Sequence, residues 1–193
     1  MKKILLLLAN GFEAYEASVF TDVLGWNLLE GDHSTQLVTC GRRPELTCTW
    51  NFRVLPEIRL ADVVPDEFDA LAIPGGFEEA GFYEDAFSED FLSLIRAFDQ
   101  ADKVIASICV GALPVGRSGI LNGRKGTTYH LNNGHRQQQL AEYGVEVINR
   151  PIVVDRNIIT SSSPATALDV AFLLLEKLTS AENCRNVRHL MGF

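Results

Sequence analysis

Several features that mark other classes of protein are missing from this sequence. Its apolar runs are too short to cross a membrane, and the run Ile4–Ala9 is also too short for an export signal. None of the four cysteines forms a CxxC pair, so we expect reduced thiols rather than a disulfide framework. Basic residues are in the minority, with 17 Lys and Arg against 25 Asp and Glu, which gives a net charge of −8. This balance disfavours nucleic acid and anionic membranes as partners. The short apolar run at the start and the reduced thiols together lead us to expect a cytoplasmic protein.

Enough apolar residues are present for a sizeable core. The chain has 193 residues, of which 47% are hydrophobic, so it needs neither a disulfide nor a metal to fold. It contains no repeat, low-complexity segment or Ser/Pro-rich linker, so we expect one domain over residues 1–193. His130 and His135 are five positions apart with no carboxylate to complete a ligand set, so we expect no metal site.

Short apolar runs alternate with amphipathic stretches along the chain. The runs predict strands at 4–8, 36–39, 70–73, 104–108, 146–148, 152–155 and 158–160, with a short hairpin within 47–57. The amphipathic stretches predict helices at 13–30, after Ser88, at 110–118, at 132–143, after Pro164 and after Ser180. This order predicts an α/β fold: a doubly wound, mostly parallel sheet with helices on both faces. Ligands of such sheets bind at the carboxyl ends of the strands.

Cys109 lies at one of these strand ends, where the strand leads directly into a helix. Small residues, Ser107 and Gly111, flank it at −2 and +2, which is the pattern of a nucleophile elbow with cysteine in place of serine. A thiol at a helix N-terminus has a lowered pKa, because the helix dipole favours the thiolate. The spacing alone fits a buried cysteine at a strand end equally well.

Two other strand ends carry polar groups or glycines. Gly75 and Gly76 follow the strand at 70–73, and their backbone N–H groups are candidates for an oxyanion hole near Cys109. Glu13 and Glu16 open the helix after the first strand. Glu13 is explained by the helix dipole, whereas a buried Glu16 would have a raised pKa and could hydrogen-bond the thiolate.

Taken together, these loops resemble the ThiJ/PfpI superfamily, which includes the DJ-one deglycase family. The resemblance covers nearly the whole chain and rests on four segments in order: Gly11–Glu16, Leu71–Gly76, Ala106–Gly111 and Thr160–Pro164. It implies a flavodoxin-like sheet and a homodimer. The activities that it implies include cofactor-free glyoxalase or deglycase action, amidase or peptidase action, and redox-linked chaperoning.

The resemblance also assigns roles to individual residues. Cys109 matches the reactive, oxidation-prone cysteine, and Glu16 matches the glutamate that contacts it. Gly75 and Gly76 match the glycines of the oxyanion hole, and the Val110 N–H group would point into the same site.

The sequence departs from the family pattern at two positions. Val110 stands where the peptidase-like members have a histidine, which disfavours a protease. Many members have a histidine directly after a Thr-Thr pair, whereas here Tyr129 follows the pair and His130 comes one residue later. Either His130 or Tyr129 then enters the site, and an ordinary loop histidine is an equally good interpretation of His130. Phe77 is a candidate for the pocket wall or for the core.

We therefore expect a cysteine-dependent enzyme that acts on a small reactive carbonyl, such as an α-oxoaldehyde. In this hypothesis the Cys109 thiolate attacks the carbonyl and Glu16 carries the proton, with His130 as a further catalytic candidate. The alternative is a redox sensor in which Cys109 is oxidised rather than turning over substrate. Amidase or peptidase activity is a second alternative.

Overall fold

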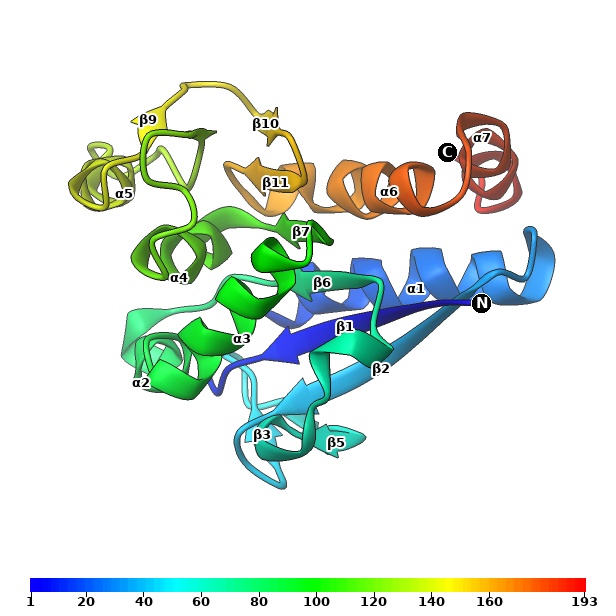
Figure 1. The fold of residues 1–193 in the computed structure, drawn as a ribbon, viewed down its shortest axis with the longest axis horizontal. Helices are drawn as coiled ribbons and strands as arrows, with labels where there is room; N and C mark the ends of the chain where they lie inside the picture. The colour runs from blue at the N-terminus through cyan, green and yellow to red at the C-terminus, as the bar shows by residue number, and fades with distance from the viewer.

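The seven-stranded central sheet is mostly parallel, as predicted. A computed structural model describes all 193 residues and gives the strand order β10-β11-β7-β6-β1-β2-β5 (Figure 1). Only β10 runs antiparallel to its neighbour. The strands of this sheet are β1 (Lys2–Leu8), β2 (Thr35–Gly41), β5 (Ile58–Arg59), β6 (Ala70–Ile73), β7 (Val104–Ser107), β10 (Ile152–Asp155) and β11 (Ile158–Ser161).

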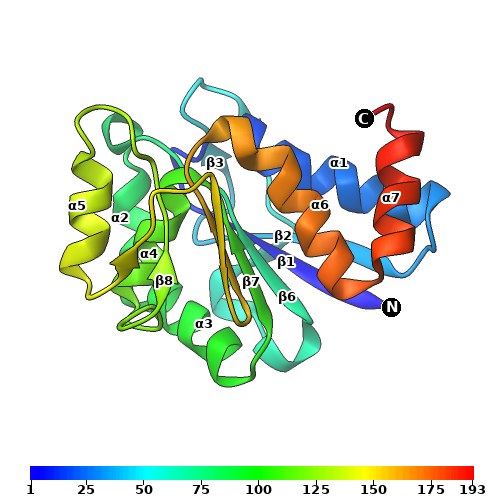
Figure 2. The ribbon, with the colours of Figure 1, turned by 90° about the horizontal axis from the view of Figure 1, so that it is seen from above.

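Helices cover both faces of the sheet (Figures 1 and 2). One face carries α1 (Ala14–Glu30), α6 (Ala167–Leu178) and α7 (Ala181–Leu190), which pack on one another. The other face carries α2 (Phe82–Ala86), α3 (Glu89–Gln100), α4 (Ala112–Arg117) and α5 (His135–Glu142). None of the helices is both long enough and apolar enough to cross a membrane.

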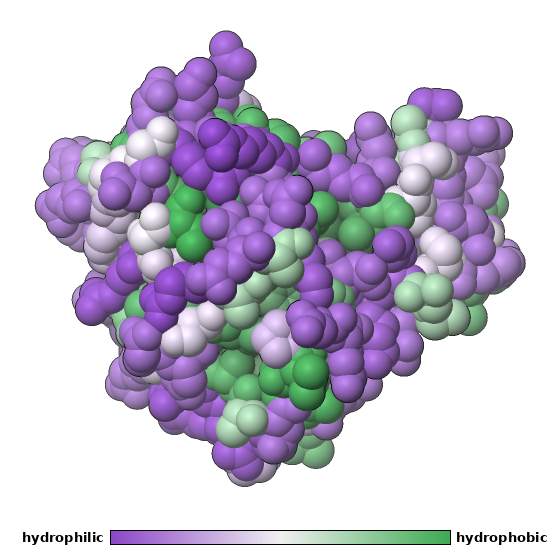
Figure 3. All heavy atoms as spheres, viewed as in Figure 1, coloured by the Kyte–Doolittle hydropathy of each residue, from purple (hydrophilic) through white to green (hydrophobic).

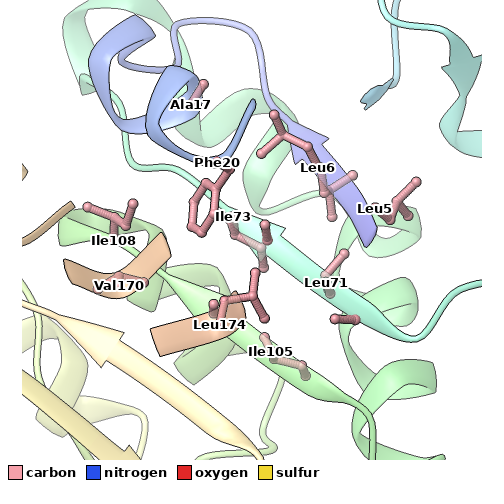
Figure 4. Packing of buried hydrophobic residues seen from close by; sticks show 14 of the residues in the cluster. Leu5, Leu6, Ala17, Phe20, Leu71, Ile73, Ile105, Ile108, Val170 and Leu174 are labelled. Atoms are coloured by element: carbon pink, nitrogen blue, oxygen red, sulfur yellow. The ribbon is translucent and has the colours of Figure 1, made fainter. Parts of the chain in front are cut away.

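The core forms where these helices meet the sheet. Residues 4–8 of β1 are all buried, because a strand covered on both faces needs apolar side chains at every position. Figure 4 shows Phe20 of α1 pointing toward Ile73 of β6, with Val170 and Leu174 of α6 beside β7. Polar residues cover most of the face shown in Figure 3, and apolar residues appear there as separate patches.

Two small sheets extend the loops at the ends of the central strands. The predicted hairpin consists of β3 (Leu46–Thr47) and β4 (Arg53–Val54), which are antiparallel. Thr47 joins it to the loop after β1: its N–H donates to Asn10 Oδ1 at 2.9 Å, and its C=O accepts from Gly11 N at 2.8 Å. The second small sheet pairs β8 (Lys125–Gly126) with β9 (Glu146–Val147) in parallel.

Two predicted helices begin later than the sequence indicated. The helix predicted from Val110 starts as a short 3₁₀ turn, Cys109–Gly111, and becomes α-helical only at Ala112. The helix predicted at 132–143 begins at His135, because residues 132–134 have φ angles of 57°, 61° and 68°. Those left-handed values are incompatible with a right-handed helix.

Candidate active site

The loops after β1, β6 and β7 meet at the carboxyl end of the sheet. Phe12, after β1, forms an antiparallel bridge with Gly76, after β6. Ile108, after β7, donates its N–H to Ile73 O at 3.1 Å. The fold thus brings together the three strand ends that the sequence analysis singled out.

Cys109 lies in a strained turn of the backbone. Its φ is +55°, a left-handed value that costs a residue with a side chain about 1–3 kcal/mol and persists only where the surroundings enforce it. Three contacts do so here. Gly111 N donates to Ile108 O at 2.8 Å, Thr128 Oγ1 donates to Cys109 O at 2.9 Å, and Gly111 packs so closely that a Cβ atom there would lie 2.7 Å from Ile73 O. This is the backbone geometry of the predicted nucleophile elbow.

Glu16 reaches the same place from the first turn of α1. Its side chain is fully buried, and Oε2 accepts a hydrogen bond of 2.6 Å from Gly75 N. Only glycine fits at position 75, because a Cβ atom would lie 2.8 Å from that oxygen. The other oxygen, Oε1, is buried without a hydrogen-bond partner of ordinary geometry. The carboxyl group lies beside the Cys109 thiol and interacts with it.

Burial dominates the electrostatics of this pair. It raises the pKa of Glu16 from 4.5 to about 8, and the negative charge of Glu13 adds to the effect. Glu13 is itself half-buried, and its pKa is raised for that reason. At neutral pH the Glu16 carboxyl group is therefore mostly protonated.

The predicted lowering of the Cys109 pKa is wrong. Burial raises the pKa of this thiol, and an ionised Glu16 raises it further, whereas the Val110 N–H group has a smaller opposing effect. The helix dipole contributes little, because the thiol faces a short 3₁₀ turn and the following helix has only six residues. A thiolate here depends on moving the proton to a neighbouring base.

Two of the three predicted oxyanion donors are free. The Gly76 and Val110 N–H groups donate to no backbone oxygen, and both residues line the same pocket as Cys109. The Gly75 N–H group is not available, because it is engaged by Glu16. Its role is therefore to hold the glutamate, which corrects the prediction for that residue.

A pocket of about 520 Å³ opens over Cys109. Its walls come from the loop after β6, from the segment that leads into α5 and from the turn before α6. The lining residues are Glu13, Gly76, Phe77, Glu78, Glu79, Cys109, Val110, Tyr129, Leu131, Asn132, His135, Arg136, Ser163, Pro164 and Ala165. No group of three or more His, Cys, Asp or Glu side chains is arranged to hold a metal ion.

The structure separates the two candidates that follow the threonine pair. Tyr129 lines the pocket, whereas His130 does not, and its Nδ1 atom is buried without a partner. His130 was predicted as a catalytic candidate, but its side chain does not line the pocket in which it would have to act. The sequence analysis noted the Thr127-Thr128 pair but did not predict that Thr128 hydrogen-bonds Cys109 O. It also did not single out Arg136, which lines the pocket and for which the sequence carried no signal.

Known proteins resemble this chain in sequence over most of its length. The model of the DJ-1/PfpI family matches residues 2–177. Protein dj-1beta of Drosophila melanogaster is 29% identical over 192 residues, covering 96% of this chain and 94% of that protein. Deglycase PfpI of Pyrococcus furiosus is 32% identical over 162 residues, covering 84% of this chain and 90% of that protein.

Solved structures confirm the predicted flavodoxin-like fold. The crystal structure of Drosophila melanogaster DJ-1beta superposes with a TM-score of 0.84 at 26% identity, covering 98% of this chain and 97% of that one. The structure of oxidised Toxoplasma gondii DJ-1 gives a TM-score of 0.81 at 22% identity, covering 99% and 98% of the two chains.

Proposed function

Because this chain belongs to the DJ-1/PfpI family, we propose that it is a cofactor-independent cysteine enzyme that acts on small reactive carbonyls, in the manner of a glyoxalase or deglycase. One observation carries the proposal: Cys109 is held in a left-handed turn beside the buried carboxyl group of Glu16, at the base of a pocket. The name of the Pyrococcus furiosus relative, a deglycase, supports the same substrate class.

The first step forms a bond between sulfur and carbon. Glu16 in its ionised form takes the proton of the Cys109 thiol, and the thiolate attacks the aldehyde carbon of an α-oxoaldehyde. The C=O π electrons move to the oxygen, where the Gly76 and Val110 N–H groups stabilise the negative charge. Glu16 then returns its proton to that oxygen, which completes a hemithioacetal.

The second stage moves hydrogen within the bound substrate. Glu16 removes the proton from the former aldehyde carbon and delivers it to the adjacent carbonyl carbon, while the oxygen protons redistribute. The product is a 2-hydroxyacyl thioester on Cys109. Water then cleaves this thioester, releasing a 2-hydroxy acid and restoring the thiol, so that the net change is the addition of one water molecule to the oxoaldehyde.

The redox-sensor alternative requires that Cys109 be accessible to an oxidant. Oxidation proceeds through an accessible thiolate, and Cys109 is only 7% exposed with a pKa that is raised by burial. A mechanism in which Glu16 generates the thiolate when a carbonyl is bound agrees better with this environment.

The protein also presents a surface that suits the proposed homodimer. Large apolar side chains are exposed beside the β3–β4 hairpin: Trp50 at 67%, Phe52 at 64% and Leu55 at 72%. Trp50 also packs against Phe77 of the pocket wall, with ring centroids 5.5 Å apart. Clustered apolar exposure of this kind is typical of protein interfaces, and a second copy seated here would lie next to the pocket.

Turnover of methylglyoxal to lactate tests the proposed activity. The purified protein should show saturable turnover without added metal or thiol cofactor, and Cys109→Ser should reduce it at least about 1000-fold because the nucleophile is lost. Cys184→Ser removes another buried thiol, outside the pocket, and should retain the activity. Turnover that survives in Cys109→Ser, or its absence in the wild-type protein, would refute the assignment.

A further inference from the structure

Arg136 is the one arginine or lysine among the residues that line the Cys109 pocket. Its side chain is only 19% exposed. The guanidinium group lies over the ring of Tyr83, 5.1 Å from the centroid, and its Nη1 atom donates to Gln139 Oε1 at 2.9 Å. These contacts hold the planar group in one orientation, so little conformational freedom would be lost on binding a ligand.

The only partner of Arg136 that carries a negative charge is weakly attached. Arg136 Nη2 donates to Glu78 Oε2 at 2.7 Å, and no second hydrogen bond joins the two side chains. Glu78 is 64% exposed and belongs to the short turn after β6. A single contact with an exposed carboxylate is worth about 0–1 kcal/mol, so a ligand can displace it at little cost.

The position of Arg136 relative to the thiol makes it relevant to substrate choice. Arg136 and Cys109 line the same pocket, which has a volume of about 520 Å³. A small molecule that places its carbonyl carbon at Cys109 can therefore extend a second group toward Arg136. The group that a guanidinium fork recognises best is a carboxylate, through two parallel hydrogen bonds.

We propose that Arg136 is a specificity residue that binds the carboxylate of the substrate, with Glu78 as an internal carboxylate that the substrate displaces. The substrate class is then a small α-oxoaldehyde that also bears a carboxylate, because the second stage of the reaction needs a carbonyl carbon next to the aldehyde. This inference rests on the proposed function, because it places the reacting carbonyl at Cys109.

The other charges of the pocket limit how this recognition works. Glu13 and Glu79 also line the pocket, so its formal charge is not positive even when Glu78 is displaced. Long-range attraction of an anion is therefore not the source of selectivity. Selectivity comes from the fixed hydrogen-bond geometry of the Arg136 guanidinium group. Because the rest of the pocket is acidic, a singly charged substrate fits this site better than a multiply charged one.

Two alkylating reagents test the inference without requiring turnover. Iodoacetate and iodoacetamide have the same leaving group and similar size, but only iodoacetate carries a carboxylate. The ratio of their rate constants at Cys109, followed by mass spectrometry, isolates recognition of that carboxylate from the reactivity of the thiol. Arg136→Gln should lower the ratio of iodoacetate to iodoacetamide about 10-fold, and Arg136→Lys should lower it less, because lysine keeps the charge but loses the fork.

Glu78→Gln makes the opposite change, at a side chain that is 64% exposed. It should raise the ratio about 3-fold, because the competing internal carboxylate is gone. Arg188→Gln is the matched control: Arg188 also lies over an aromatic ring, that of Phe172, and also pairs with an exposed carboxylate, that of Asp169, but it does not line the pocket. Its ratio should equal that of the wild-type protein.

The outcomes separate this inference from the proposed function. If Arg136→Gln and Glu78→Gln leave the ratio unchanged while iodoacetamide labels Cys109, carboxylate recognition by Arg136 is refuted. The proposed turnover of carbonyl substrates is not refuted by that result. If the ratio shifts as expected but methylglyoxal is not turned over, the carboxylate site stands and the enzymatic assignment fails. If neither reagent labels Cys109, the thiol is not accessible from the pocket and both are overturned.

Discussion

At the scale of single residues, the proposed chemistry depends on Glu16 and Cys109, each of which shifts the proton affinity of the other. Glu16 is buried and Cys109 is nearly so, and burial raises the pKa of both. With the carboxyl group protonated and the thiol neutral, the resting site carries no charge on either group. The proposed reactive form requires the loss of one proton from the pair and the transfer of the remaining proton from sulfur to the Glu16 carboxylate.

The raised pKa of Glu16 makes the stability of the protein depend on pH. The folded protein binds this proton more tightly than the unfolded chain does, so its contribution is fully present below about pH 4.5 and is lost as the pH rises toward 8. The free energy of unfolding should therefore fall by up to about 5 kcal/mol across this window. In Glu16→Gln that part of the decline should be absent, as measured by urea unfolding at intervals of pH.

Glu30→Gln, at the exposed far end of the same helix, is the control for the change in net charge. Its stability curve should keep the slope of the wild-type protein. If Glu16→Gln has the same slope as well, Glu16 is not protonated in the folded state at neutral pH, and the electrostatic description of the pair is wrong.

At the scale of secondary-structure elements, the site depends on the close approach of α1 to the loop after β6. Gly75 makes this approach possible, and Gly75→Ala would place a Cβ atom 2.8 Å from Glu16 Oε2 and 3.1 Å from Ile108 O. We expect a loss of about 1–3 kcal/mol in stability, together with slower alkylation of Cys109, because Glu16 is pushed from its place.

Gly25, within α1, is the matched control for this substitution. A Cβ atom at Gly25 would meet nothing within 4 Å, and alanine is the better helix former. Gly25→Ala should therefore raise the free energy of unfolding by up to about 1 kcal/mol and leave the rate of alkylation as it was. If Gly75→Ala and Gly25→Ala change the free energy of unfolding and the rate of alkylation equally, the contact between Gly75 and Glu16 is not a tight one.

The elements also show what can and cannot be predicted from the sequence. The strand at 70–73 matches β6 residue for residue, because a fully buried parallel strand is a continuous apolar run bounded by Asp69 and Pro74. The start of α5 was missed because three successive left-handed residues have no periodic signature, although asparagine and glycine are the residues that tolerate them.

The same limit applies to the site. The elbow around Cys109 was predicted, since it follows from spacing along one stretch of chain and from a family motif. Phe77 and Tyr129 were only candidates for the pocket, each with an alternative left open, and the structure places both in its lining. The raised pKa of Cys109 and the hydrogen bond from Gly75 to Glu16 were not predicted. They depend on burial and on distances between segments remote in the sequence, which a sequence pattern does not encode.

At the scale of the whole molecule, the site exists only because the sheet order places β6 between β1 and β7. That order brings the first turn of α1, the glycines after β6 and the cysteine after β7 to one edge. No segment of the chain contains the proposed nucleophile, its proton partner and the oxyanion donors together, so the proposed activity requires the assembled fold.

The central claim, that Glu16 and Cys109 act as one proton-sharing pair, is tested most directly by the pH dependence of Cys109 alkylation by iodoacetamide. In the wild-type protein the rate should rise with pH around a midpoint near 8, where the pair loses its first proton. In Glu16→Gln the thiol has no base to receive its proton, so the rate at pH 7 should fall at least about 10-fold and the midpoint should move to higher pH. Superimposable profiles for the two proteins would contradict the account, because Cys109 would then ionise independently of Glu16.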